Sequence, residues 1–138
     1  MKLVWRTFLK FEGNDYSELG IQNFREFITD GNLQNAFLRG EYQMLIAKDM
    51  QRIIGVASLR DRNHLSLLFV DEHYHRRGVG RRLLITLFHY LRDEVGESSM
   101  SLKASPYALN FYLRLGFRQT ADVEEYAGIR ATPMERRI

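Results

Sequence analysis

Cysteine is absent from the 138-residue chain, and proline occurs only twice, at Pro106 and Pro133. The missing thiols exclude disulfide bridges, cysteine metal ligands and an acyl-cysteine intermediate. No stretch reaches the roughly 20 apolar residues that a membrane-spanning helix needs, so we expect no membrane partner. The amino-terminal residues lack a continuous apolar run and a small-residue cleavage site, and we interpret them as the start of the fold. The sequence therefore favours a cytoplasmic protein.

Basic charge is concentrated in one part of the chain. The net charge is +3, and five arginines with no Asp or Glu lie between His73 and Arg92. One compact patch suits a small polyanion better than a long nucleic-acid backbone, so we rank a nucleic-acid-binding domain last and expect no nucleic-acid partner. His73 and His75 form an isolated pair with no evident acidic partner beyond Asp71 and Glu72, and we expect no metal site.

Residues 1–138 are predicted to form one domain, since 45% of them are apolar and no linker or repeat interrupts the chain. Hydrophobic periodicity predicts a helix after Gly80, with its apolar face at Leu83, Leu84, Leu87, Phe88 and Leu91. A right-handed crossover through this helix makes its flanking strands parallel, which predicts an α+β fold with a mixed sheet. The expected strands are 1–11, 42–49, 52–61, 64–71, 99–105, 117–128 and 129–138, and the other helices are 14–30, 32–40 and 106–116.

Two glycines, Gly78 and Gly80, lie where the strand at 64–71 turns into the next helix. Glycine allows close backbone approach, and the unpaired amides of a helix N-terminus favour an anion. The neighbouring arginines, Arg76, Arg77, Arg81 and Arg82, would strengthen polyanion binding. Neither the P-loop nor the dinucleotide fingerprint fits "GVGRRL", because the Lys-Ser/Thr pair and the third glycine are missing. A plain surface turn remains the alternative.

The segment "SPYALNFYLRLGF", from Ser105 to Phe117, is the second constellation. On a helix, Ala108, Phe111, Tyr112 and Leu115 share one stripe, which is typical of core packing. Tyr112 fits the core as well. Its hydroxyl could also reach the carboxyl end of the sheet and act as a general acid.

Together, "HRRGVG" (75–80) and "SPYALNFYLRLGF" resemble the GCN5-related N-acetyltransferases. The resemblance implies a three-layer α/β/α acyl-CoA N-acyltransferase fold. Its mostly antiparallel, six- to seven-stranded sheet would contain a central splayed parallel pair. It also implies acetyl transfer from acetyl-CoA to a primary amine, directly and through a tetrahedral intermediate. The departure is His75, where the family carries Gln or Arg; since the phosphate contacts come mainly from backbone, we expect binding to survive.

The resemblance also assigns roles to individual residues. Backbone amides of the turn would bind the pyrophosphate, namely those of Arg76, Arg77, Gly78, Val79, Gly80 and Arg81. Leu68, Phe69 and Val70 would pair with the pantetheine arm, and the Val70 amide would polarise the acetyl carbonyl. Ser105 would touch the cofactor arm, and Tyr112 would protonate the departing thiolate.

The sequence identifies the general base less clearly than it identifies the cofactor-binding residues. Strand alternation places His64, Ser66, Leu68 and Val70 on one face. Some family members carry histidines there, so His64 is the first candidate base, although a solvent-exposed histidine explains it equally well. The alternatives are Glu12, Glu18, Glu41 and Glu72.

Several classes of acceptor and role stay open. Acidic residues in 10–40 and 123–130 favour a cationic small-molecule or peptide amine as acceptor. A non-catalytic acyl-CoA sensor or interaction module on the same fold is the alternative function. Edge strands near the carboxyl end allow pairing in a homodimer.

Overall fold

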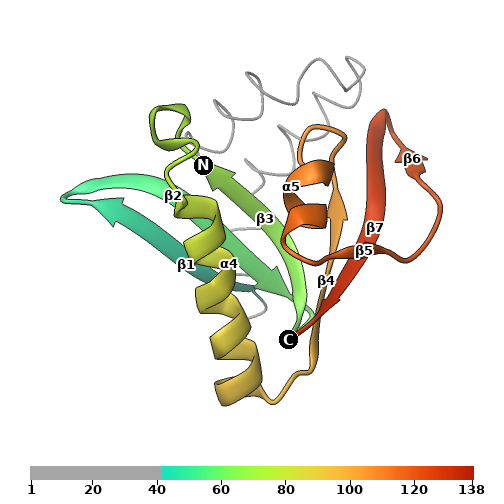
Figure 1. Ribbon diagram of the computed structural model, residues 1–138, viewed down its shortest axis with the longest axis horizontal. Helices are drawn as coiled ribbons and strands as arrows, with labels where there is room; N and C mark the ends of the chain where they lie inside the picture. Colours follow the sequence, from blue (N-terminus) through green and yellow to red (C-terminus); the bar gives the residue numbers. More distant parts are fainter. Residues whose placement is uncertain (1–41) are drawn as a thin grey trace.

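The computed structural model describes residues 42–138, which form one sheet with helices packed on it (Figure 1). The strands are β1 (Tyr42–Asp49), β2 (Arg52–Arg60), β3 (His64–Val70), β4 (Ser99–Ala104), β5 (Arg118–Gln119), β6 (Glu124–Tyr126) and β7 (Ile129–Arg137). The helical segments are η2 (Glu72–Tyr74), α4 (Val79–Tyr90), the π-helix η3 (Leu91–Val95) and α5 (Leu109–Arg114). The elements predicted at 1–11, 14–30 and 32–40 lie outside the described residues.

The sheet has the order β1-β2-β3-β4-β7-β5, and β6 also pairs with β7. Within residues 42–138, β3 and β4 are the single parallel pair, and all other pairs are antiparallel. The predicted mixed, mostly antiparallel sheet with a central parallel pair is therefore confirmed. The hairpin predicted from 42 to 61 is also confirmed, with Met50 at φ 55° in its turn. No helix in this part of the chain is long and apolar enough to cross a membrane.

Helix α4 packs on the sheet through the face that the sequence predicted. Its side chains Leu83, Leu84, Leu87 and Phe88 are buried, and Leu91 follows in η3. The helix lies very close to β2, because a Cβ on Gly55 would come within 3.0 Å of Leu83 Cδ1. In Figure 1, α5 lies beside α4 on the same side of the sheet. Phe117, 1% exposed, joins the two helices through its ring contact with Phe88.

Helix α5 begins three residues later than the predicted start at Pro106. The Ala108 amide donates to both the carbonyl and the Oγ of Ser105, at 3.1 and 3.3 Å, and this turn delays the helix. The strand predicted at 117–128 is wrong as one element, because it divides into β5 and β6. The Pro133 carbonyl accepts from the Thr120 amide, but Pro133 has no N–H to donate back at this edge of β7. The ladder between β5 and β7 therefore stops at that point.

Candidate active site

The parallel strands β3 and β4 separate soon after they meet. They pair only at His64 with Ser101 and at Leu65 with Leu102, and the described residues form no further rungs between them. A cleft of about 110 Å³ opens beyond these rungs. Its lining residues are Leu65, Ser66, Leu67, Leu68, Phe69, Leu102, Lys103, Ser105, Ala108 and Tyr112. The splay expected from the family resemblance is therefore present, and an extended ligand could pair with the open strand edges.

The backbone of β3 presents alternate residues to this cleft. The Asp71 amide donates to the Ile54 carbonyl of β2 at 2.7 Å, so Asp71 and, two residues earlier, Phe69 face β2. By the same alternation, the amides and carbonyls of Leu68 and Val70 point to the opposite edge, toward β4. Of the three residues predicted to bind the cofactor arm, Leu68 and Phe69 line the cleft, and the backbone groups of Val70, the next residue, point to the same edge as those of Leu68.

A β-bulge at Ser66 interrupts the simple alternation along β3. Ser58 is opposite Leu67, whereas the next residue, Leu59, is opposite Leu65, so Ser66 has no partner in the register. Leu65 therefore lies in the same core cluster that Leu68 and Val70 pack against. The prediction that His64 and Ser66 share a face with Leu68 and Val70 is wrong, because the extra residue offsets the strand by one position.

The Ser66 side chain holds this bulge in place. Its Oγ lies 2.6 Å from Ser58 Oγ and donates to the Ser58 carbonyl at 3.2 Å. Ser58 is fully buried, so the bonds are protected from solvent. The bulge lies next to the last β3–β4 rung, and it helps to end the ladder where the cleft begins.

The glycine turn leads from the end of β3 into α4. Gly78 is the N-cap of α4 with φ 80°, and Arg76 also has a positive φ of 62°. The first helical bond runs from the Arg82 amide to the Gly78 carbonyl at 3.0 Å. The preceding amides at the helix start lack intrahelical acceptors by geometry, and the first turn carries no acidic side chain. The turn is therefore suited to an anion.

The arginines around the turn are exposed to solvent. They are Arg76, Arg77, Arg81 and Arg82, and none of them forms an ion pair with a residue in 42–138. Arg77 stacks over the Tyr74 ring at 5.2 Å. Their charges are thus available to a ligand rather than neutralised by neighbouring carboxylates of this part of the chain.

Gly80 places the glycine turn next to helix α5, which carries the second sequence motif. A Cβ at this position would lie 3.3 Å from Phe111 Cζ and 3.6 Å from Val70 Cγ2. The Phe111 ring in turn makes an edge contact with the Tyr112 ring, with centroids 5.2 Å apart. The start of α4, the end of β3 and helix α5 are therefore packed together at one corner of the cleft.

His75 joins the turn to the strand end. Its Nε2 lies 2.7 Å from the Val70 carbonyl, and because a carbonyl only accepts, Nε2 is the protonated nitrogen. The Val70 carbonyl points to the edge that faces β4, so the imidazole lies at that edge. At the motif position where the resemblance expects Gln or Arg, this chain has His75, whose side chain donates to the backbone of the strand.

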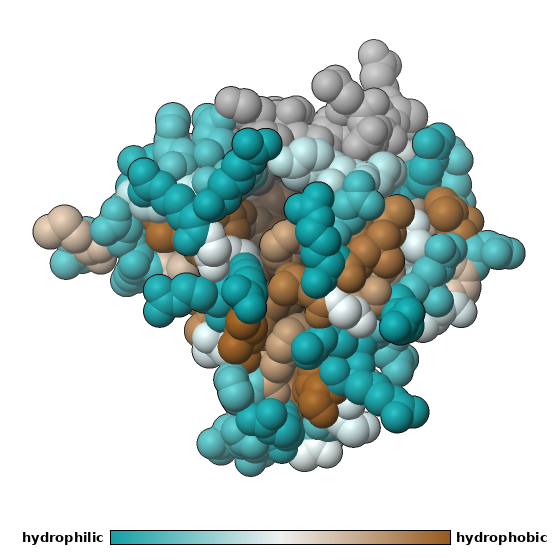
Figure 2. Space-filling model, viewed as in Figure 1, coloured by the Kyte–Doolittle hydropathy of each residue, from teal (hydrophilic) through white to brown (hydrophobic). Residues whose placement is uncertain are grey.

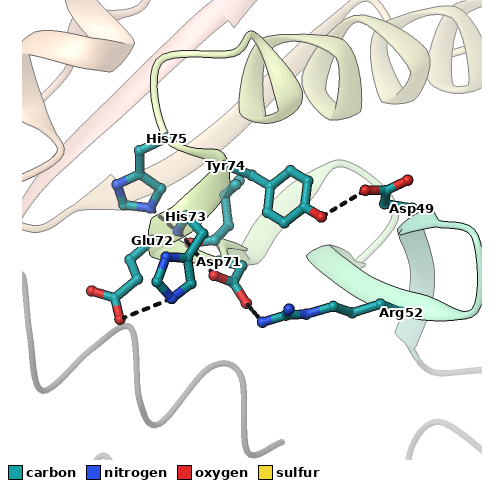
Figure 3. A network of polar contacts seen from close by, with 8 residues as sticks. Asp49, Arg52, Asp71, Glu72, His73, Tyr74 and His75 are labelled. Carbon is teal, nitrogen blue, oxygen red and sulfur yellow. Dashed lines mark hydrogen bonds and ion pairs between the residues drawn. The ribbon is translucent and has the colours of Figure 1, made fainter.

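Figure 3 shows a polar network that fixes the segment before the turn to the β1–β2 hairpin. Arg52 Nη2 donates to the fully buried Asp71 at 3.1 Å, and the Asp71 carboxylate also accepts from the His73 amide at 3.0 Å. Tyr74 donates to Asp49 at 2.6 Å. Sequence analysis did not find this network, because its members are far apart in the chain and carry no motif.

Tyr112 and Ser105 both line the cleft, as the sequence pattern suggested they could. Tyr112 is 7% exposed, and its ring is held between Phe111 and Phe117 by edge contacts. Ser105 is also buried, and its Oγ accepts from the Ala108 amide at the turn into α5. Tyr112 belongs to the packed core and also lines the cleft, so its core role and its predicted site role are compatible.

His64 lies at the closed end of the cleft and is not among its lining residues. Its Nδ1 is 2.9 Å from Ser101 Oγ. Burial, together with the nearby positive charges of Arg60 and Lys103, lowers the pKa of His64 to about 4. The ring is therefore neutral at pH 7. Of the other candidate bases, Glu72 lies in η2 outside the cleft lining, and Glu12, Glu18 and Glu41 lie outside the described residues.

Several lining residues were not predicted, among them Ser66, Lys103 and Ala108. Lys103 lies on β4, opposite the strand that the resemblance assigned to the cofactor, and the spacing of "SLKAS" gave no reason to select it. Viewed as in Figure 1, Figure 2 shows apolar side chains along the middle of the face, between α4 and α5, with hydrophilic side chains on either side. Within residues 42–138, no group of three or more His, Asp or Glu could hold a metal ion.

A mixed sheet whose central parallel pair splays beside a glycine turn defines an acyltransferase type of fold. The family model described as "Acetyltransferase (GNAT) domain" matches residues 12–138. The chain therefore belongs to the GNAT acetyltransferase family, as its motifs indicated.

Solved structures share this fold over nearly the whole chain. A GCN5-related N-acetyltransferase from Rhodopseudomonas palustris is 24% identical with a TM-score of 0.84, and the match covers 99% of this chain and 86% of that one. The PaiA N-acetyltransferase of Thermoplasma acidophilum, solved with coenzyme A, is 19% identical with a TM-score of 0.80, covering 99% and 89%. A GNAT acetyltransferase from Staphylococcus aureus Mu50 is 17% identical with a TM-score of 0.71, covering 99% and 91%.

Proposed function

We propose that this protein is an N-acetyltransferase that moves the acetyl group of acetyl-CoA directly to a primary amine. The observation that carries the proposal is the separation of β3 from β4 after two rungs, which opens a cleft lined by Tyr112, next to the corner where Gly80 of the turn packs near Phe111. An extended cofactor would then bind with its diphosphate at the glycine turn and its thioester in the cleft. Membership of the acetyltransferase family supports the reaction class.

The turn supplies the groups that a diphosphate requires. The proposed donors are backbone amides from Arg76 to Arg81, and Gly78 leaves open space, because a Cβ there would meet nothing within 4 Å. The four exposed arginines of the turn add positive charge. The pantetheine arm would then extend along the cleft edge of β3, where Leu68 and Val70 present their backbone groups, and past Ser105 on the opposite side.

The Val70 carbonyl accepts from His75 and is therefore already engaged by the protein. The proposal accordingly assigns only the Val70 amide to the acetyl-CoA side of the cleft. That amide would polarise the acetyl carbonyl and stabilise negative charge on its oxygen as the tetrahedral intermediate forms.

The group transfer needs one bond made and one bond broken. The neutral amine attacks the thioester carbon to form a C–N bond, and collapse of the tetrahedral intermediate breaks the C–S bond. The thiolate takes a proton from the Tyr112 hydroxyl, the ammonium proton of the intermediate leaves to water, and the Tyr112 phenolate regains a proton from water, which balances the reaction. No protein thiol is involved, because the chain contains no cysteine.

His64 is a weak candidate for direct removal of the amine proton. An alkylammonium has a pKa near ~10.4, whereas the pKa of His64 is lowered to about 4. The gap makes complete proton transfer unfavourable by roughly six powers of ten. The proposal therefore keeps His64 as a neutral hydrogen-bonding group at the closed end of the cleft, and the acceptor proton passes to solvent water.

The test is release of free thiol from acetyl-CoA in the presence of a library of primary amines. Replacing Tyr112 by Phe removes the hydroxyl and keeps the ring contacts, so we expect kcat to fall about a hundredfold or more with unchanged coenzyme A affinity. Unchanged turnover at saturating substrate would remove Tyr112 from the chemistry. Tight coenzyme A binding without turnover of any amine would favour the acyl-CoA sensor instead.

A further inference from the structure

The chain contains few primary amines, and one of them lines the cleft. Arginine and lysine together number 20, of which four are lysine: Lys2, Lys10, Lys48 and Lys103. Two of these lie in the described residues. Lys103, on β4, lines the cleft, whereas Lys48, on β1, is separated from it by strand β2. An amine is the nucleophile of the proposed reaction, so Lys103 stands beside the place where its own protein would hold a thioester.

The Lys103 ammonium is held by an ion pair in the described conformation. Its Nζ lies 2.9 Å from Glu124 Oε2 on β6. Strand β6 pairs with β7, and in Figure 1 it lies on the side of β7 away from β4. The pair therefore draws the ammonium across β7, away from the cleft.

This restraint is weak. The Lys103 and Glu124 side chains are 50% and 48% exposed, and ion pairs as exposed as this one open readily. A flexible lysine side chain released from Glu124 can thus turn back toward the cleft that its own strand borders.

We propose that Lys103 is a self-acetylation site, an inference that rests on the proposed acetyltransferase function. The neutral Lys103 Nζ attacks the thioester carbon, a C–N bond forms and the C–S bond breaks. Water takes the proton lost from the nitrogen, and the thiolate leaves with a proton from Tyr112. The acetylated side chain is uncharged, so it no longer forms the ion pair with Glu124, and this side-chain link between β4 and β6 is lost while the β4–β7 ladder remains.

The test incubates the full chain with acetyl-CoA and no added amine, and follows acetylation of each lysine peptide by mass spectrometry. We expect Lys103 to gain one acetyl group at a rate independent of protein concentration, with Lys48 as the unmodified internal control. Glu124→Gln should raise the Lys103 rate about two- to fivefold, which matches the loss of an exposed ion pair. Lys103→Arg should abolish the modification of that peptide, because a guanidinium is not nucleophilic.

Three results would overturn the inference. Equal labelling of Lys48 and Lys103 would mean chemical acetylation by the reagent, and a rate that rises with protein concentration would mean transfer between molecules. An unmodified Lys103 in a protein that acetylates an added amine would refute self-acetylation and leave the proposed function standing. Failure to bind coenzyme A in calorimetry would instead refute the proposed function itself.

Discussion

Replacing Gly80 by Val tests whether the glycine turn and Tyr112 act as one packed unit. A Cβ on Gly80 would lie 3.3 Å from Phe111 Cζ, closer than an ordinary contact, and 3.6 Å from Val70 Cγ2. Valine adds two further methyl groups, and its χ1 angle is restricted in a helix. The Phe111 ring must therefore move, and its 5.2 Å edge contact transmits the movement to the Tyr112 ring.

The expected loss of stability in Gly80→Val follows from overpacking at one corner of the core. Inserting methyl groups into a packed site costs about 1–3 kcal/mol, which for a chain of this length lowers Tm by roughly 3–10 °C. The backbone at Gly80 is helical, so the substitution causes no strain in φ. We expect thermal unfolding to show this loss and thiol release to show a lower kcat, because Tyr112 is displaced from its position at the cleft.

Gly96→Ala is the matched control. Gly96 has φ 83° at the end of η3, so alanine costs about 1–2 kcal/mol there, but its Cβ would meet nothing within 4 Å. It should lower Tm by a similar amount and keep kcat. If Gly80→Val retains full kcat at saturating substrate while Gly96→Ala behaves as expected, then Phe111 does not couple the turn to Tyr112 and the reasoning is refuted.

Three further variants test the site and the core. His75→Ala should weaken coenzyme A binding about fivefold in calorimetry, because one backbone hydrogen bond is lost, whereas His75→Gln keeps a donor and should bind normally; equal affinity in both would show that the bond from His75 to the Val70 carbonyl does not support binding. Phe117→Ala should lower the free energy of unfolding by about 3–5 kcal/mol in urea titrations, since the ring is fully buried, and a loss below about 1 kcal/mol would contradict that burial. The lowered pKa of His64 predicts that stability falls as the pH drops from 6.5 to about 4, because the unfolded state binds the proton first; the loss should be roughly 1–2 kcal/mol after allowing for partial exposure, and His64→Gln should flatten this slope.

Much of the fold could be predicted because local patterns and tertiary packing agree. The five apolar positions from Leu83 to Leu91 are the buried face of α4 and η3, and the turn chemistry around Asp49 and Arg52 matches the hairpin. The division of 117–128 into two strands could not be read from periodicity. It depends on Pro133, which lies on the neighbouring strand and lacks the N–H that a continuous ladder needs.

The parts of the site that belong to a sequence motif could be predicted. The parts that depend on the register between strands could not. The turn at Gly78 and Gly80 and the helix that bears Tyr112 were found from residue spacing. The bulge at Ser66 was not, because it depends on the pairing of β3 with β2, and it changes the face on which His64 lies. Lys103 was missed for a similar reason, since its place at the cleft follows from the separation of two strands.

The residues around the turn explain why two motifs distant in sequence belong to one site. Gly80 contacts Phe111 and Val70, His75 donates to the Val70 carbonyl, and Phe111 contacts Tyr112. The Arg52–Asp71 bond connects the same corner to the hairpin. A diphosphate held at the turn and a thioester beside Tyr112 would thus be positioned by a single rigid packing unit. Since the contacts of Gly80 and His75 join separate elements of the fold, disturbing any one of them should change the cofactor position before it unfolds the protein.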